Sequence, residues 1–160
     1  MERGGLKIMT NDPITLQPIG YVRTDIADAD IPRRRSQILS ELILLESYTE
    51  ALDGIEEYSH LFVLFWMHRV NIQEYRAKIH PRGRKELPLT SVLATRGRNH
   101  PNPLDLAVVE LLERNANRLK VRRLDAFNGT PIIDIKPYDP YDVFPDIRVP
   151  DWWHRLRQQA

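Results

Sequence analysis

Short segments with the apolar pattern of β-strands recur along the whole chain, and no long helix pattern separates them. Parallel α/β folds alternate strands with long helices, so this order argues against a doubly wound parallel sheet. We therefore predict a mainly β fold, a single closed or nearly closed antiparallel β-barrel with a few short helices. Strands are expected at residues 14–24, 36–45, 61–70, 89–96, 104–115 and 118–124, and between the Asn128-Gly129 turn and Pro137.

The segments with weaker patterns are interpreted from their turn residues and apolar spacing. The apolar run LFVLFWM begins the strand at 61–70, which we expect to be buried on both faces. The apolar positions of 104–115 suit a buried strand or a helix, and the turn-like sequence at 115–117 favours a hairpin strand. Residues 47–60 indicate a short helix or two turns, and residues 71–88 form a long loop with many basic residues.

A chain of 160 residues is long enough for one substantial core and too short for two. We expect a flexible N-terminus at 1–13, a barrel domain at 14–149 and a C-terminal helical tail at 150–160 packed on the barrel. The chain has no cysteine, no signal-peptide pattern at its start and no apolar run of membrane-spanning length. These features favour a cytoplasmic protein that uses no disulfide and no membrane.

The common short motifs of catalysis are missing from the sequence. There is no G-x-G-x-x-G or P-loop pattern, no H-E-x-x-H and no G-x-S-x-G. The five histidines also lack the spacing of metal ligands, so we expect no metal site.

Basic residues are clustered although the net charge is only +1. Such clusters attract polyanions, or they are ordinary solvated surface. The clusters are Arg33–Arg35, then Arg76, Lys78, Arg82, Arg84 and Lys85, and finally Arg118, Lys120, Arg122 and Arg123.

Four motifs, in this order, carry a resemblance to a known family. They are PIGYVRTD (18–25), LDGIEEYSHLFVLFWMHRV (52–70), ATRGRNHPNPLDLAVVELL (94–112) and LDAFNGTPIIDIKPYDPY (124–141). Together they resemble the TsaA-like, or TrmO, family of tRNA methyltransferases. The resemblance implies an S-adenosylmethionine-dependent β-barrel enzyme that forms homodimers, with the cofactor near the subunit interface. It also implies N6-methylation of threonylcarbamoyladenosine, the modified adenosine 3′ of the tRNA anticodon.

The resemblance also implies which residues contact the cofactor. Arg96 is the candidate to pair with the cofactor's carboxylate, or it forms a structural pair with Asp125 or Asp134. The full set is Pro32, Arg33, Arg34, His68, Arg69, Arg96, Leu106, Asp125, Ala126, Phe127, Asn128, Gly129 and Thr130.

The chain departs from the family pattern at several of these places. Where the family usually reads R-P-N-P-I-G-L-S, this chain has His100, Asp105 and Ala107 in place of the arginine, glycine and serine. Asn128 replaces the aspartate of D-G-T. Because histidine titrates near neutrality and arginine does not, a different acceptor, or a non-catalytic module that binds the cofactor or RNA, stays an alternative.

The acceptor nitrogen of threonylcarbamoyladenosine is conjugated and therefore a poor nucleophile, so removal of its proton would assist methyl transfer. Asp134, Lys136 and Tyr138 alternate and so share one strand face. We assign Asp134 as base or orienting group, Lys136 to phosphate or substrate carboxylate and Tyr138 to stacking or hydrogen bonding; alternatively the three form a network at the barrel rim. The residues assigned to substrate or RNA are Arg98, Asn99, His100, Asn102, Arg82, Arg84 and Lys85.

Overall fold

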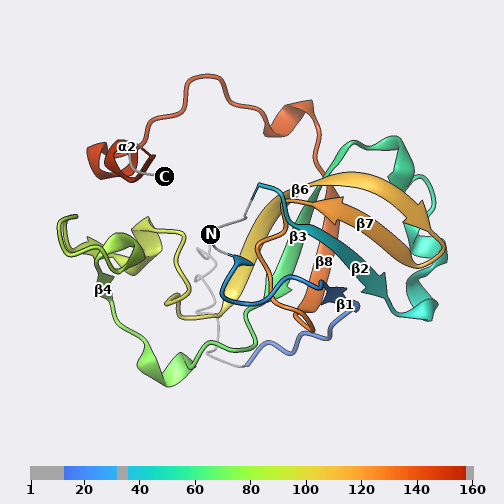
Figure 1. Cartoon of the computed structure of the whole chain (residues 1–160), viewed down its shortest axis with the longest axis horizontal. Coiled ribbons are helices and arrows are strands. Elements are labelled where there is room, and N and C mark those ends of the chain that lie inside the picture. Colours follow the sequence, from blue (N-terminus) through green and yellow to red (C-terminus); the bar gives the residue numbers. More distant parts are fainter. Residues whose placement is uncertain (1–12, 32–35, 158–160) are drawn as a thin grey trace, which may run out of the picture.

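The computed structural model describes residues 13–31 and 36–157. Within them, six strands close into a barrel in which every neighbouring pair is antiparallel, in the order β1-β2-β7-β6-β3-β8 (Figure 1). The predicted mainly β barrel is confirmed. Its strands are β1 (Gly20–Arg23), β2 (Leu39–Leu44), β3 (His60–Trp66), β6 (Leu104–Asn115), β7 (Arg118–Arg122) and β8 (Pro131–Pro137).

The barrel interior is filled by alternate residues of the strands, as the two-residue period of a strand requires. In β3, Leu61, Val63 and Phe65 are at most 2% exposed and belong to the core cluster. Phe62, Leu64 and Trp66 point outward and are only half-buried. The prediction that this strand is buried on both faces is therefore wrong, because its outer face has no covering layer in the described chain.

A group of 3-10 turns closes one end of the barrel, at Glu46–Tyr48, Glu50–Leu52 and Ile55–Glu57. Arg114 at the end of β6 donates to Asp53 Oδ1 at 2.7 Å and to Glu56 Oε2 at 3.0 Å, and so fastens these turns to the barrel. A backbone hydrogen bond and the Arg114 guanidinium hold the pKa of Glu56 below its ordinary value. Residues 47–60, for which a short helix or two turns were predicted, thus contain a series of single 3-10 turns.

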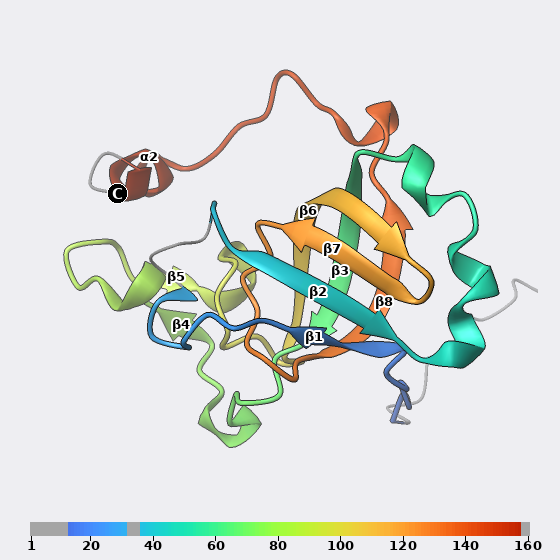
Figure 2. The ribbon, with the colours of Figure 1, turned by 45° about the vertical axis from the view of Figure 1, so that its right-hand side comes forward.

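Residues 71–95 form a lobe beside the barrel, which we call the β4–β5 lobe (Figures 1 and 2). It contains β4 (Lys78–Ile79) paired with β5 (Thr90–Ser91) and 3-10 turns at Ile72–Glu74, Pro81–Gly83 and Val92–Ala94. The strand predicted at 89–96 is largely wrong. Its partner β4 offers only two paired residues, and the chain turns immediately afterwards to bury Val92.

After β8 the chain crosses the molecule through a segment stiffened by prolines to helix α2 (Asp151–Arg157). A capping box at Asp139 begins the 3-10 turn Pro140–Asp142 on the way. The predicted C-terminal helix is present, but it lies beside the β4–β5 lobe and away from the barrel strands in both ribbon views (Figures 1 and 2). The packing of this tail on the barrel is therefore not observed. No helix in the described ranges is long and apolar enough to cross a membrane.

Candidate functional site

Three connections leave the barrel at the same end, because β1, β3 and β7 all run toward it and β2, β8 and β6 all start from it. They comprise residues 24–38, 67–103 and 123–130. Nearly all of the predicted cofactor residues belong to them or to the adjoining start of β6. Pro32, Arg33 and Arg34 lie outside the described residues.

The connection 123–130 is held against β1 by hydrogen bonds at both of its edges. Asn128 Oδ1 accepts from the Thr24 backbone N–H at 3.1 Å, and the Gly129 N–H donates to the Val22 carbonyl at 2.8 Å. Gly129 has a φ of +78°, which a glycine adopts without strain. The following residue, Thr130, is 2% exposed, and its carbonyl accepts from the Val22 N–H. The loop therefore has a defined shape before any ligand binds.

His68 and Arg69 at the end of β3 join this loop to the connection after β1. Thr130 Oγ1 lies 3.4 Å from His68 Nδ1, and the guanidinium of Arg69 lies 4.9 Å from the centre of the Phe127 ring. Arg69 also forms an ion pair with Asp28. Its Nε donates to His68 Nε2 at 3.3 Å, so the neutral ring carries its proton on Nδ1, facing Thr130. The structure thus brings the predicted residues His68, Arg69, Phe127 and Thr130 together.

Partial burial, and then the charge of Arg69, hold the pKa of His68 below its ordinary value of 6.5, and Asp28 opposes them. A lowered folded-state pKa means that this ring contributes stability above pH 6.5 and loses it as the pH falls through the folded pKa. We expect an NMR titration of the His68 ring to have its midpoint below 6.5. The loss of thermal stability between pH 7 and pH 5 should be smaller in His68→Gln than in the wild type. A midpoint at or above 6.5 would contradict the described contacts.

Arg96 lies on the third connection and reaches the first residues of β6. It donates to the carbonyl of Leu106, and the Met67 N–H donates to the Pro103 carbonyl at 2.7 Å, so this segment borders the end of β3. The alternative structural pair with Asp134 is not observed, because that carboxylate pairs with Lys136. Leu106 itself is 40% exposed. An arginine with unused donors therefore lies next to an accessible apolar side chain.

The predicted catalytic residues lie along the outer face of β8 and lead away from this end of the barrel. Asp134 and Lys136 form an ion pair at 2.8 Å, and Tyr138 contacts the Phe62 ring edge-on at 5.2 Å. At about 3.3 Å per residue, Asp134 is roughly 13 Å and Tyr138 roughly 26 Å from Thr130 along the strand. Within one chain the structure does not bring Lys136 and Tyr138 to the cofactor loops.

The residues predicted to contact RNA lie on two segments. His100 uses Nε2 in a contact with the Thr95 carbonyl at 2.9 Å, so its ring is engaged inside its own loop. Arg84 pairs with Glu86 in the β4–β5 lobe. The exposed members of this set are Arg82, Lys85, Arg98 and Asn102, and Asn99 is half-buried. Residues 13–31 and 36–157 contain no group of three or more His, Asp or Glu side chains placed to hold a metal ion.

Comparison with known proteins decides the family. The family model described as the tRNA-methyltransferase O N-terminal domain matches residues 25–142, more than half of the chain. The chain belongs to the tRNA-methyltransferase O family. This confirms the resemblance found in the four sequence motifs.

The relatives of this chain differ in length, and the solved structures share its fold. An S-adenosyl-L-methionine-binding protein of Archaeoglobus fulgidus is 42% identical over 78% of this chain and 89% of its own length. A tRNA (adenine(37)-N6)-methyltransferase of Mus musculus is 30% identical over 90% of this chain and 35% of its own. The crystal structure of TrmO from Pseudomonas aeruginosa has a TM-score of 0.67 at 33% identity, covering 86% of this chain. The chain spans 62% of that solved protein.

The substitutions that separate this chain from the tRNA-methyltransferase O pattern are readily accommodated. Position 128 needs an acceptor oxygen for the Thr24 N–H, and asparagine supplies one as aspartate would. Asp105 Oδ1 accepts from the Leu106 N–H at 2.8 Å, and Ala107 packs against the core. Two further site residues, Thr24 and Asp28, were missed by sequence reasoning. Thr24 lies within the first motif, whereas nothing in the sequence pairs Asp28 with Arg69.

Proposed function

We propose that this chain is a cytoplasmic S-adenosylmethionine-dependent methyltransferase that methylates N6 of threonylcarbamoyladenosine beside the tRNA anticodon. The observation that supports it most is the convergence of three separate connections at one barrel end, joined through His68, Arg69, Phe127 and Thr130 in a tRNA-methyltransferase O domain.

The donor set at this end fits S-adenosylmethionine, which carries a carboxylate, an ammonium, a ribose and an adenine. Arg96 has five N–H donors, and among the described residues its hydrogen bond to the Leu106 carbonyl engages one of them, so the others can bind a carboxylate. The exposed side chain of Leu106 offers an apolar surface for the adenine. The buried hydroxyl of Thr130, next to His68, and the exposed amide of Asn128, which accepts from the Thr24 N–H, hold the loop in position.

The bound cofactor would supply an electrophilic methyl group, and the protein supplies position and proton transfer. In-line displacement depends on alignment, so loops that are ordered by their own hydrogen bonds contribute to the rate by holding both reactants. We assign Asp134 to accept the proton of the acceptor nitrogen. The Asp134 Oδ1 accepts from the Ile135 N–H at 2.8 Å, and its Oδ2 contacts Lys136. These two contacts orient the carboxylate on the outer face of β8.

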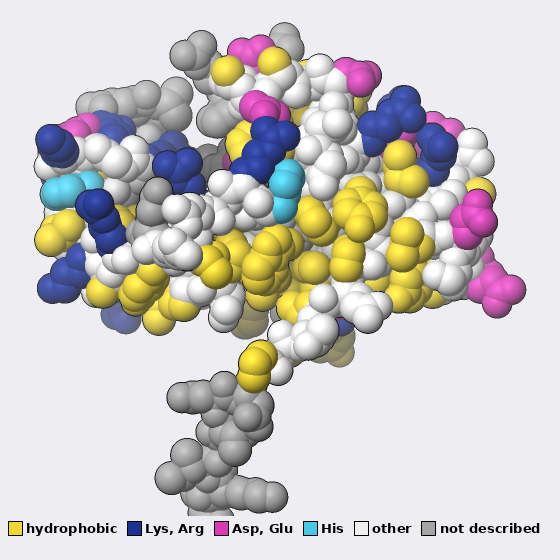
Figure 3. All heavy atoms as spheres, turned by 90° about the horizontal axis from the view of Figure 1, so that it is seen from below, with side chains coloured by type: hydrophobic (Ala, Val, Ile, Leu, Met, Phe, Trp, Pro, Cys, Tyr) yellow, Lys and Arg dark blue, Asp and Glu magenta, His cyan; other side chains and the backbone are white. Residues whose placement is uncertain are grey.

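The separation of Tyr138 from the cofactor loops supports a homodimer in which a second copy completes the site. The outer faces of β3 and β6 present Phe62, Leu64 and Trp66 opposite Val108, Leu106 and Leu104, and Val108 is 39% exposed. Figure 3 shows hydrophobic side chains gathered in a broad band on one face of the molecule, bordered by Lys and Arg side chains. Contiguous apolar surface rimmed by polar residues is typical of a protein interface.

Substituting Val108→Asp is expected to raise the dimer dissociation constant by at least about 30-fold, because a carboxylate would be placed in the apolar centre of the interface. Sedimentation equilibrium measures the change directly. The matched control is Leu39→Asp on β2, across the barrel, where the native side chain is 47% exposed and dimerisation should be unaffected. Equal dissociation constants for wild type and Val108→Asp would refute this interface.

Methyl transfer itself tests the function. The protein is incubated with labelled S-adenosylmethionine and total tRNA from a strain that lacks it, and the labelled nucleoside is identified. Label on the anticodon-adjacent threonylcarbamoyladenosine supports the proposal. Label on another nucleoside or on a small molecule supports a different acceptor. The contact of His100 with the Thr95 carbonyl favours this alternative, because the ring is engaged inside its own loop. Cofactor binding without any transfer would indicate a non-catalytic module.

A further inference from the structure

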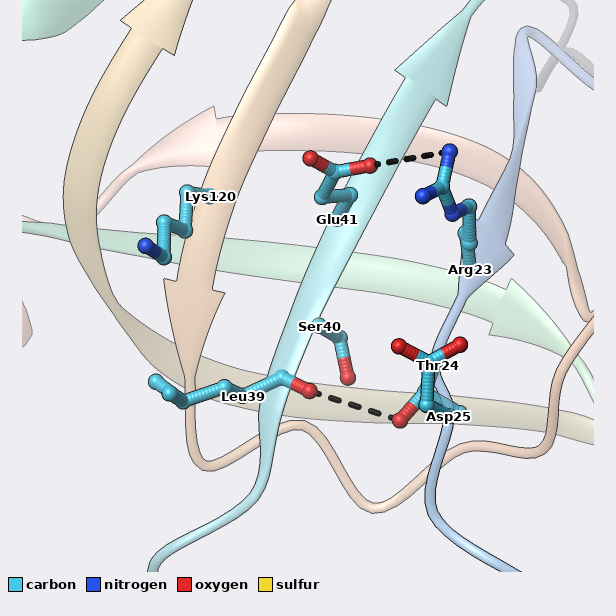
Figure 4. A pocket seen from close by; sticks show the side chains of 7 residues that line it. All are labelled: Arg23, Thr24, Asp25, Leu39, Ser40, Glu41 and Lys120. Atoms are coloured by element: carbon cyan, nitrogen blue, oxygen red, sulfur yellow. Dashed lines mark hydrogen bonds and ion pairs between the residues drawn. The ribbon is translucent and has the colours of Figure 1, made fainter.

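A hollow of about 170 Å³ lies on the barrel between β1, β2 and β7, and the proposed cofactor contacts do not include it (Figure 4). It adjoins the cofactor end, because Thr24 in its wall donates its backbone N–H to Asn128 of the connection 123–130. The residues that line it are Arg23, Thr24, Asp25, Leu39, Ser40, Glu41 and Lys120.

The uncharged polar side chains in the wall of this hollow are not open to a ligand from outside. Ser40 is 4% exposed and lies on the inward-facing side of β2, where alternate residues of the strand are buried. The neighbouring Thr24 hydroxyl is engaged, since it donates to the Leu39 carbonyl at 3.3 Å. A ligand would therefore meet mainly the charged side chains of the lining.

The charges around the hollow are mixed, and the mixture limits the ligand class. Glu41 lies between Lys120 and Arg23 in Figure 4 and pairs with Arg23 at 3.6 Å and with Arg118 at 3.8 Å, while the described residues give Lys120 no ion-pair partner. Asp25 adds a second carboxylate. A free phosphate would be attracted by the two cations and repelled by the two carboxylates. A ligand with both an anionic group and hydroxyl donors satisfies both kinds of side chain.

Cations continue from the hollow along β7. Arg118, Lys120 and Arg122 occupy alternate, exposed positions on its outer face, with Leu119 and Val121 turned inward at 0% exposure. Alternate residues of a strand are about 7 Å apart, a spacing that suits successive phosphates of an extended nucleic-acid strand. This is the third basic cluster of the sequence, to which the proposed function gave no role.

We propose that this hollow binds a ribose-phosphate unit of the RNA backbone, with Lys120 on the phosphate and Glu41 accepting from the ribose 2′-hydroxyl. The inference rests on the proposed RNA substrate and adds a contact surface on the β7 side of the barrel. Because DNA lacks the 2′-hydroxyl, the carboxylate gives the site a preference for RNA.

Lys120→Ala tests the phosphate contact in full-length protein, with direct binding to an anticodon stem-loop RNA as the readout. We expect the dissociation constant to rise about 3- to 10-fold and the slope of log K against log salt to fall by about 0.7 to 0.9 in magnitude, one phosphate contact. S-adenosylmethionine affinity should not change. The matched control is Arg155→Ala, an exposed cation on α2. Equal RNA affinity and salt slope for wild type and Lys120→Ala would overturn the inference.

Glu41→Gln tests the ribose contact by comparing the RNA stem-loop with its 2′-deoxy counterpart. We expect wild type to prefer the RNA form and Glu41→Gln to lose at least half of this preference on a logarithmic scale; an unchanged preference would count against the assignment. Because binding is measured without methyl transfer, the two proposals fail separately. If the protein methylates tRNA but Lys120→Ala binds RNA like the wild type, only this contact is refuted. If Lys120→Ala weakens RNA binding but the protein methylates no tRNA, only the enzymatic assignment is refuted.

Discussion

Replacing Arg96 with alanine is expected to weaken S-adenosylmethionine binding by about 10- to 100-fold, the equivalent of one charge-assisted pair of about 1.5 to 3 kcal/mol. Arg96 is the cation that the structure places against the first residues of β6, through its bond to the Leu106 carbonyl. The substitution removes the proposed partner of the cofactor's carboxylate and a contact that positions Leu106. Isothermal titration calorimetry with S-adenosylmethionine measures the change.

Two variants make this result specific. Arg98→Ala removes an exposed cation two residues away and should leave cofactor affinity within about twofold, as expected for surface charge. Arg96→Lys retains the charge without the planar fork and should bind with intermediate affinity. If Arg96→Ala and Arg98→Ala bound the cofactor as tightly as wild type, the cofactor assignment at this barrel end would be wrong.

Substituting Gly20→Ala is expected to destabilise the fold by about 3 kcal/mol, and so to lower the melting temperature by roughly 6 to 12 °C. A Cβ at position 20 would lie 2.4 Å from the Ile43 carbonyl oxygen and 2.8 Å from the Leu44 Cα. Both are backbone atoms of the paired strand β2, so no side chain can move aside. Gly20 also pairs with Ile132 where β1 meets β8 over only two residues, and a displaced β1 would open the barrel there.

Gly97→Ala is the matched control for this clash. A Cβ at position 97 would meet its nearest neighbour, Ile79 Cδ1, at 3.5 Å, an ordinary contact distance. Its melting temperature should stay within a few degrees of wild type, and thermal unfolding followed by circular dichroism compares the two variants. A Gly20→Ala protein as stable as Gly97→Ala would show that β1 and β2 are not as close as described.

The barrel was predictable because its strands carry their own local signals. The alternation in RLKVR predicts β7, and the turn at 115–117 correctly favoured a strand over a helix for LDLAVVELLERN, which is β6. The pattern at 89–96 is apolar enough to predict a strand. That prediction was wrong because β4 supplies only two paired residues. A strand depends on its partner, and no local pattern reports the partner's length.

The site was predictable only in part, for a similar reason. Family motifs located His68, Arg69, Arg96 and the 125–130 run, yet the ion pair between Arg69 and Asp28 joins residues 41 positions apart. The shared face of Asp134, Lys136 and Tyr138 follows from the strand period. The direction of β8, which leads them away from the cofactor loops, follows only from the strand order.

By itself, the sequence determined the fold class, the family and the identity of the residues that the site can use, because strand period, turn residues and motif order are local properties of the chain. The tertiary structure alone decided which barrel end collects the three connections, that the described residues leave the outer face of β3 and β6 uncovered, and that Glu41 and Lys120 border one hollow. Those relations depend on barrel closure, which sets residues distant in the chain beside one another through strand register.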